Sequence, residues 1–168
     1  ARVCCYGGVN AKKKFEYKTI KSCLALNAIF DTNFECVYGC LGLGDCVKVC
    51  PVNAIKMNEK NLPEIDQNLC IGCGKCADVC PKKIIKMVPF DKEIYISCSS
   101  FDKGGIVTKI CQTGCIACGR CEKVCPTGAI KMENNLPIID YEKCDNCGKC
   151  VEECPRKIIF TSKISTLA

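Results

Sequence analysis

The sequence predicts an α+β fold made of small, repeated, cysteine-rich modules, and three observations support this. Cysteine occurs 21 times in 168 residues, far above its ordinary usage. A motif of four cysteines, separated by two, two and three residues and followed by proline, recurs along the chain. The second half also repeats the first at an interval of about 75 residues, since the segment AIKMNEKNLPEID after Cys50 is matched by AIKMENNLPIID after Cys125.

The spacing of the motif is typical of bacterial ferredoxins that bind two 4Fe-4S clusters. The first three thiolates of such a motif bind one cluster, and the fourth, next to the proline, binds the partner cluster. Disulfides and four-cysteine zinc sites are the alternatives, but neither requires these consecutive intervals. We therefore expect two tandem bacterial-type two-cluster ferredoxin modules with short helices and two-stranded hairpins, preceded by an N-terminal extension.

Residues 1–33 form this extension. Residues at helical spacing predict a short amphipathic helix within positions 17–30, namely Ile20, Cys23, Leu24, Asn27 and Ala28. We expect the helix to pack against the first module. The extension also contains Cys4 and Cys5, and no role is assigned to Cys4.

Residues 34–87 are expected to form the first module. Its first motif is altered, with intervals of three, five and three residues, and its glycines can provide the turns that a longer ligand loop needs. Its second motif is regular. Crossed ligation assigns one cluster to Cys36, Cys40, Cys46 and Cys80. It assigns the other cluster to Cys70, Cys73, Cys76 and Cys50.

A bridge over residues 88–113 follows, in which EIYIS and IVTKIC enclose the turn-rich SSFDKGG. This pattern predicts a β-hairpin. The bridge carries Cys98 and Cys111, which remain unassigned together with the cysteines of the extension. Two interpretations stay open for these residues: reduced structural thiols, or a fifth cluster bound by Cys5, Cys23, Cys98 and Cys111.

The second module spans residues 114–160, and the tail over 161–168 has no recognisable role. One cluster is assigned to Cys115, Cys118, Cys121 and Cys154, and the other to Cys144, Cys147, Cys150 and Cys125. In both modules the apolar pair after each Cys-Pro predicts a short strand, and one helical turn fits between the third and fourth cysteines. Asp66 and Asp140 precede cluster loops, where we expect them to cap turns rather than act as catalytic acids.

The composition excludes several classes of function. The chain has no histidine and no GxGxxG after a predicted strand, so we expect no catalytic site of its own. The formal charge of +6 counts neutral thiols, and four clusters with their thiolates would bring roughly two negative charges each. Scattered lysines and 7% aromatic residues argue against nucleic-acid binding. Neither a signal peptide nor a membrane span is expected, because no apolar run of about 18 residues occurs.

Four segments carry a family resemblance: ARVxC, CVYGCLGLGDCVKVCP, SCSSFDKG with its following CQTGCIACGRC, and IDYEKCDNCGKCVEECP. In these segments the chain resembles the C-terminal ferredoxin region of the B subunit of Rnf complexes, the ion-translocating ferredoxin:NAD oxidoreductases of anaerobic bacteria. The resemblance implies an electron-transfer subunit at the cytoplasmic side of the cell membrane. It would accept low-potential electrons from ferredoxin and pass them to other subunits of a membrane-bound complex. The family's membrane helix and its further four-cysteine domain do not occur in this sequence, which fits a soluble fragment.

Two other functions stay open at the level of sequence. A soluble polyferredoxin, or an electron-transfer subunit of a hydrogenase or heterodisulfide-reductase-type enzyme, would carry the same motifs and differ in its docking partner. A structural module in which zinc only stabilises the fold would also use cysteine pairs. Visible absorption near about 400 nm that bleaches on reduction separates iron-sulfur clusters from zinc.

Overall fold

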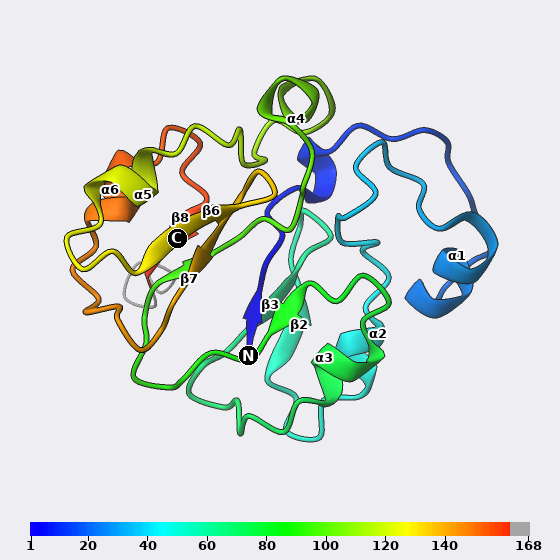
Figure 1. The fold of residues 1–168 in the computed structure, drawn as a ribbon. Coiled ribbons are helices and arrows are strands. Elements are labelled where there is room, and N and C mark those ends of the chain that lie inside the picture. Colours follow the sequence, from blue (N-terminus) through cyan, green and yellow to red (C-terminus); the bar gives the residue numbers. More distant parts are fainter. Residues whose placement is uncertain (162–168) are drawn as a thin grey trace.

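The computed structural model describes residues 1–161 and contains two similar halves, each with short helices packed beside two-stranded sheets (Figure 1). The helices are α1 (Cys23–Phe30), α2 (Asp45–Lys48), α3 (Lys75–Val79), α4 (Gly104–Ile110), α5 (Arg120–Val124) and α6 (Lys149–Glu153), with a 3-10 helix η1 at Gly8–Asn10. The strands are β1 (Arg2–Val3), β2 (Ile55–Met57), β3 (Pro63–Ile65), β4 (Ile85–Lys86), β5 (Tyr95–Ile96), β6 (Ile130–Glu133), β7 (Leu136–Ile139) and β8 (Ile159–Phe160).

The strands pair in the same antiparallel pattern in each half. In the first half β1 pairs with β4 and β2 with β3, and in the second half β5 pairs with β8 and β6 with β7. Val3 lies opposite Ile85, and Ile96 lies opposite Ile159. Each module is therefore completed by a strand that precedes its first cysteine motif, supplied by the N-terminal extension or by the bridge.

The short elements predicted within the modules are confirmed. A strand follows each Cys-Pro pair, as β2, β4, β6 and β8, and β7 is the returning strand expected at Leu136 to Asp140. A single-turn helix lies between the third and fourth cysteines of each motif, as α2, α3, α5 and α6. Each of these helices begins after a left-handed glycine, such as Gly44 with φ of 72° and Gly119 with φ of 68°. A residue with a side chain is disfavoured there, so the motif needs glycine at this turn.

The hairpin predicted for the bridge is wrong, because residues 104–110 form α4 and β5 pairs with β8 instead. Strand β8 and its neighbours offer β5 an apolar partner, and Ile94, Ile96, Ile158 and Ile159 bury together in one core cluster. In α4, Val107 is buried and lies where a side chain at Gly114 would clash. Tertiary packing thus overrides the strand pattern of IVTKIC.

The helix predicted in the extension is confirmed in its second half only. It starts at Cys23 because Ser22 caps it, accepting a hydrogen bond from the Ala25 N–H. Its buried face consists of Cys23 and Leu26, whereas Leu24, which was expected on that face, is 52% exposed.

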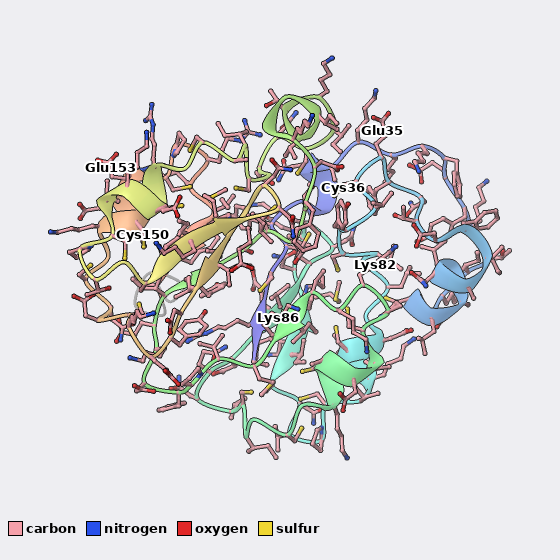
Figure 2. The ribbon with its side chains drawn as sticks, viewed as in Figure 1. Glu35, Cys36, Lys82, Lys86, Cys150 and Glu153 are labelled. Atoms are coloured by element: carbon pink, nitrogen blue, oxygen red, sulfur yellow. The ribbon has the colours of Figure 1, made fainter. Side chains whose placement is uncertain are left out.

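The buried residues gather in three clusters that include many cysteines, so the core is built around thiols. Cys36 lies near the junction of the two halves, whereas Cys150 lies with α6 in the second half (Figure 2). Within residues 1–161, no helix has both the length and the apolarity needed to cross a membrane.

Candidate metal centres

The first module contains a cavity around four thiols, and one of them differs from the predicted set. Cys40, Cys46 and Cys80 line it as expected, together with Cys23 from α1. Cys36 does not line this cavity. It lines another one, with Cys5, Cys98 and Cys111. The motif spacing placed Cys36 with Cys40, Cys46 and Cys80, whereas in the structure Cys36 lies with Cys5, Cys98 and Cys111.

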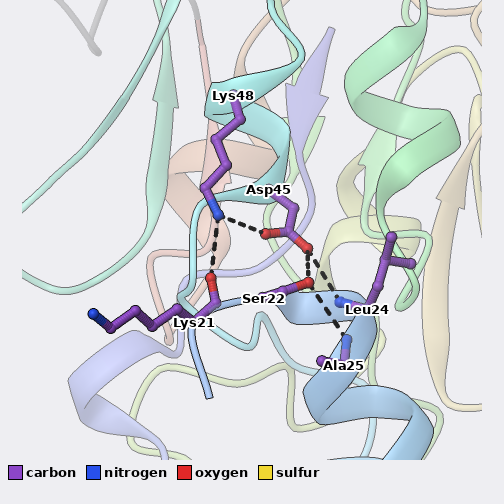
Figure 3. A network of polar contacts seen from close by, with 6 residues as sticks. All are labelled: Lys21, Ser22, Leu24, Ala25, Asp45 and Lys48. Carbon is purple, nitrogen blue, oxygen red and sulfur yellow. Dashed lines mark hydrogen bonds and ion pairs between the residues drawn. The ribbon is translucent and has the colours of Figure 1, made fainter. Parts of the chain in front are cut away.

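Figure 3 shows a polar network that involves Ser22 and Leu24, the residues on either side of Cys23. The carboxylate of Asp45, in α2, accepts hydrogen bonds from Ser22 Oγ at 2.8 Å and from the Leu24 N–H at 3.1 Å. Lys48 Nζ donates to Asp45 at 3.3 Å and to the Lys21 carbonyl at 3.1 Å. Burial alone would raise the pKa of Asp45, but these hydrogen bonds outweigh it and lower the pKa below its usual value. The network fixes the start of α1 against the helix that carries Cys46.

The internal repeat explains why a cysteine of α1 lines the first module's cavity. At an offset of 75 residues Cys40 and Cys46 correspond to Cys115 and Cys121, so Leu43 corresponds to Cys118. Leu43 packs against the cluster of Cys23, Leu26 and Leu41. The first module thus has leucine where the second module has Cys118, and α1 brings the thiol of Cys23 to the cavity from outside the motif. The sequence itself contained this information. CVYGC and CQTGC match at the same offset, so Cys36 corresponds to Cys111, which lies before the regular motif that begins at Cys115.

The other three predicted groups are brought together as expected. Cys50, Cys70, Cys73 and Cys76 line one cavity, and Cys115, Cys118, Cys121 and Cys154 line another. Cys150 lies close enough to Cys144, Cys121, Cys147 and Cys125 for their charges to interact, and three of these four complete the predicted set. In each group the fourth thiol comes from the neighbouring motif of the same module, which is the crossed arrangement of two-cluster ferredoxins.

These groups fit polynuclear clusters better than single ions. Within the described residues, no three cysteine or carboxylate side chains converge closely enough to hold one metal ion. The thiols instead surround cavities with apolar walls, such as the one lined by Ile116, Met132 and Ile158. Backbone amides also point at sulfur, as where the Ala54 N–H donates to Cys50 Sγ at 3.2 Å. Such bonds stabilise a thiolate bound to iron.

The electrostatics of the metal-free thiols agree with this. Burial raises the pKa to about 12 for Cys36, Cys46, Cys115 and Cys150. These thiols are neutral at pH 7 without metal, so iron has to displace their protons when it binds.

The two acidic residues before the cluster loops have the structural role that was predicted. Asp66 accepts a hydrogen bond from the Asn68 N–H at 2.9 Å, and Asp140 accepts one from the Glu142 N–H at 3.0 Å. Each aspartate therefore closes the turn that leads into a group of thiols.

Comparison with known proteins agrees with the metal centres. A family model described as a 4Fe-4S dicluster domain matches residues 35–84 and 69–129, and a second model of the same description matches residues 114–159. Two dicluster domains correspond to four 4Fe-4S clusters.

Three curated relatives are subunits of redox complexes. The chain is 48% identical over 145 residues to the B subunit of the proton-translocating ferredoxin:NAD(+) oxidoreductase complex of Clostridium ljungdahlii, covering 86% of this chain and 51% of that protein. It is 43% identical to the B subunit of the Na(+)-translocating complex of Acetobacterium woodii, covering 86% and 44%. It is 39% identical to the B subunit of the ion-translocating oxidoreductase complex of Methanosarcina acetivorans, covering 92% and 59%. The chain thus spans about half the length of these relatives.

Proposed function

Because the chain belongs to the family of 4Fe-4S dicluster domains, we propose that it carries single low-potential electrons from reduced ferredoxin toward the other subunits of a membrane-bound ferredoxin:NAD oxidoreductase. The observation that carries this proposal is the gathering of sixteen cysteines into four groups of four, two in each module. Identities of 39–48% to B subunits of such complexes support the choice of complex.

Three of the proposed ligand sets follow the cavities, and the fourth follows the neighbours of Cys150. They are Cys23, Cys40, Cys46 and Cys80; Cys50, Cys70, Cys73 and Cys76; Cys115, Cys118, Cys121 and Cys154; and Cys125, Cys144, Cys147 and Cys150. Each bound cluster supplies reversible one-electron transfer. The chain fixes the clusters in place, keeps water away with apolar walls and donates N–H groups to the sulfurs.

The exposed thiols indicate how electrons reach the surface. Cys73 and Cys118 are exposed, as is Cys147, so both modules present a ligand to a docking protein. Lysines at the surface favour acidic redox partners. We propose that ferredoxin docks at one module on the cytoplasmic side and that the other module faces the next subunit.

Paired variants test this route. In one variant Cys70 and Cys73 are replaced by alanine, and in its matched counterpart Cys144 and Cys147 are replaced. Reduction of the reconstituted protein by reduced ferredoxin is followed by stopped-flow absorbance near about 400 nm, where the clusters bleach. One variant should lose the fast phase and its counterpart should keep it, because electrons arrive at one module first.

Two outcomes would contradict the proposal. Equal loss of the fast phase in both variants would show that electrons do not arrive through one module. Failure of reduced ferredoxin to bleach the unaltered protein, while dithionite does bleach it, would exclude ferredoxin as the donor.

A further inference from the structure

We propose that the junction between the modules binds a fifth 4Fe-4S cluster, held by Cys5, Cys36, Cys98 and Cys111. These thiols line one cavity, which together with its opening contains about 480 Å³ of unoccupied space. The cavities beside the three groups described above contain about 320 to 380 Å³ by the same measure. The cavity at the junction is therefore comparable in size to those in the dicluster domains. Cys40 also reaches its wall, but Cys40 lines the first module's cavity as well.

The four thiols come from four separate segments that hydrogen bonds tie together. Cys5 follows β1, Cys36 follows α1, Cys98 follows β5, and Cys111 caps the end of α4. The side chains of the bridge bind the extension: Ser97 Oγ donates to the Val3 carbonyl at 3.0 Å, Ser99 Oγ to the Cys4 carbonyl at 2.8 Å, and Thr113 Oγ1 to the Tyr6 carbonyl at 2.7 Å.

The segment around Lys12 holds the remaining two thiols in place. Its N–H donates to the Ile110 carbonyl, next to Cys111, and its carbonyl accepts from the Glu35 N–H, next to Cys36, both at 2.8 Å. These long-range contacts hold together the four segments that carry the thiols.

The site has an internal twofold relationship that accidental neighbours would not share. Because Val3 and Ile96 occupy equivalent strand positions, Cys5 corresponds to Cys98. At the offset of 75 residues that relates the cysteine motifs, Cys36 corresponds to Cys111. Each half of the structure therefore contributes one thiol that follows its first strand. It also contributes one thiol four residues before the equivalent cysteines Cys40 and Cys115.

The hydrogen bonds to sulfur follow the same symmetry. The Cys40 N–H donates to Cys5 Sγ at 3.3 Å, and the equivalent Cys115 N–H donates to Cys98 Sγ at 3.4 Å. Amide donors stabilise a metal-bound thiolate much more than a neutral thiol, so this arrangement favours ligands over inert thiols.

The chemistry of binding is the same as in the other groups. Cys36 and Cys111 are only 8% and 7% exposed, and Cys5 and Cys98 are partly buried, so the four thiols are largely shielded from water. On binding, the four thiols would give up four protons to water, and each thiolate would bond to one iron of a cluster assembled from two ferrous ions, two ferric ions and four sulfide ions. This set replaces the combination considered from sequence, because Cys23 belongs to the first module's cavity and Cys36 takes its place.

The position of the site gives it a role in the electron path, and this role rests on the proposed function. Cys40 and Cys115, whose amides contact Cys5 and Cys98, are themselves proposed ligands in the first and second modules. Two ligands of a cluster at the junction, Cys5 and Cys98, would thus each be hydrogen-bonded to a proposed ligand of one module. Electrons would pass from one module to the other through it.

The test is the content of iron and acid-labile sulfide per chain, measured by native mass spectrometry after anaerobic reconstitution. The unaltered protein should contain about twenty of each, since five clusters contain four each. The double variant Cys36→Ala and Cys98→Ala should lose about four of each. Cys4→Ala is the matched control: Cys4 adjoins Cys5 but lines none of the cavities described, so its content should not change.

Three results would overturn the fifth site. They are about sixteen irons in the unaltered protein, an unchanged content in the double variant, and an equal loss in Cys4→Ala. If the double variant does not fold, the milder Cys98→Ser is examined by EPR of the dithionite-reduced protein. A change in one cluster signal supports the site, and an unchanged spectrum contradicts it. A protein with about twenty irons that ferredoxin cannot reduce contradicts the proposed function and leaves the site intact.

Discussion

Replacement of Asp45 by alanine should loosen α1 and destabilise the first metal centre. The carboxylate of Asp45 is the shared acceptor for Ser22 Oγ and the Leu24 N–H, the residues on either side of Cys23. The chain offers a matched control in Lys48→Ala, which removes the other member of the same network.

The expected size of the effect follows from the contacts. A hydrogen bond to a charged group contributes about 1.5 to 3 kcal/mol, so the two bonds at the low end give about 3 kcal/mol. The side chain of Lys48 is 62% exposed, so its ion pair with Asp45 adds little, about 0 to 1 kcal/mol. Removing Asp45 should therefore increase local opening of α1 about a hundredfold, whereas removing Lys48 should change it less than tenfold.

The effect is fully present at neutral pH. Because hydrogen bonds lower the pKa of Asp45 in the folded protein, its contribution to stability is complete above the unfolded value of about 3.9. It is lost only as the pH falls through the lower folded pKa. A measurement at pH 7 thus samples the whole contribution.

Hydrogen exchange followed by mass spectrometry measures this opening. Amides of residues 23–30 should exchange faster in Asp45→Ala, those of the second module should not change, and iron should be lost sooner on exposure to a chelator. Unchanged exchange in α1, or an equal effect of Lys48→Ala, would refute the view that Asp45 positions Cys23.

Three further predictions concern the metal centres and their supporting turns. Cys23→Ala should lower the iron content by about four per chain, lost from the first module. Single Cys36→Ala should leave the first module's EPR signal intact. The reverse result would restore the assignment made from sequence. Removal of all clusters by an anaerobic chelator should abolish cooperative thermal melting seen by circular dichroism, because the core packs against many cysteines that would hold metal; a cooperative apo-protein would disprove this. Gly104→Ala should destabilise the protein by about 2 kcal/mol, since a Cβ there would clash with the carbonyl of Ile116. The neighbouring Gly105→Ala should not destabilise it, because a Cβ at that position has no atom within contact distance. Similar melting temperatures for the two variants would contradict this.

The local parts of the structure could be predicted from sequence because the metal motif determines them. A fixed spacing of cysteines around one cluster leaves room for one helical turn, and the apolar pair after Cys-Pro has to cover the cluster, so α5 and β6 follow from the motif. The repeat at about 75 residues likewise predicted that the chain contains two modules.

The errors occurred where distant segments decide the outcome. IVTKIC has a strand pattern, yet β8 takes β5 as its partner and leaves this segment to form α4. Cys36 stands at a plausible ligand spacing, yet Cys23 lines the cavity of Cys40, Cys46 and Cys80, since Asp45 holds the start of α1 there. Neither contact leaves a local pattern in the sequence, although the alignment of Leu43 with Cys118 would have indicated a missing ligand.

The twofold relationship at the junction has a consequence for cooperativity between the modules. Two of the four thiols, Cys5 and Cys36, belong to the first half of the structure and two, Cys98 and Cys111, to the second, so each half would supply two ligands and neither would complete the site alone. Tethering both halves in one chain gives them a high effective concentration for each other. Metal bound at the junction would then work against separation of the modules, and pulling them apart would release it. A bound cluster would thus make the relative orientation of the modules a property of metal content rather than of side-chain packing alone.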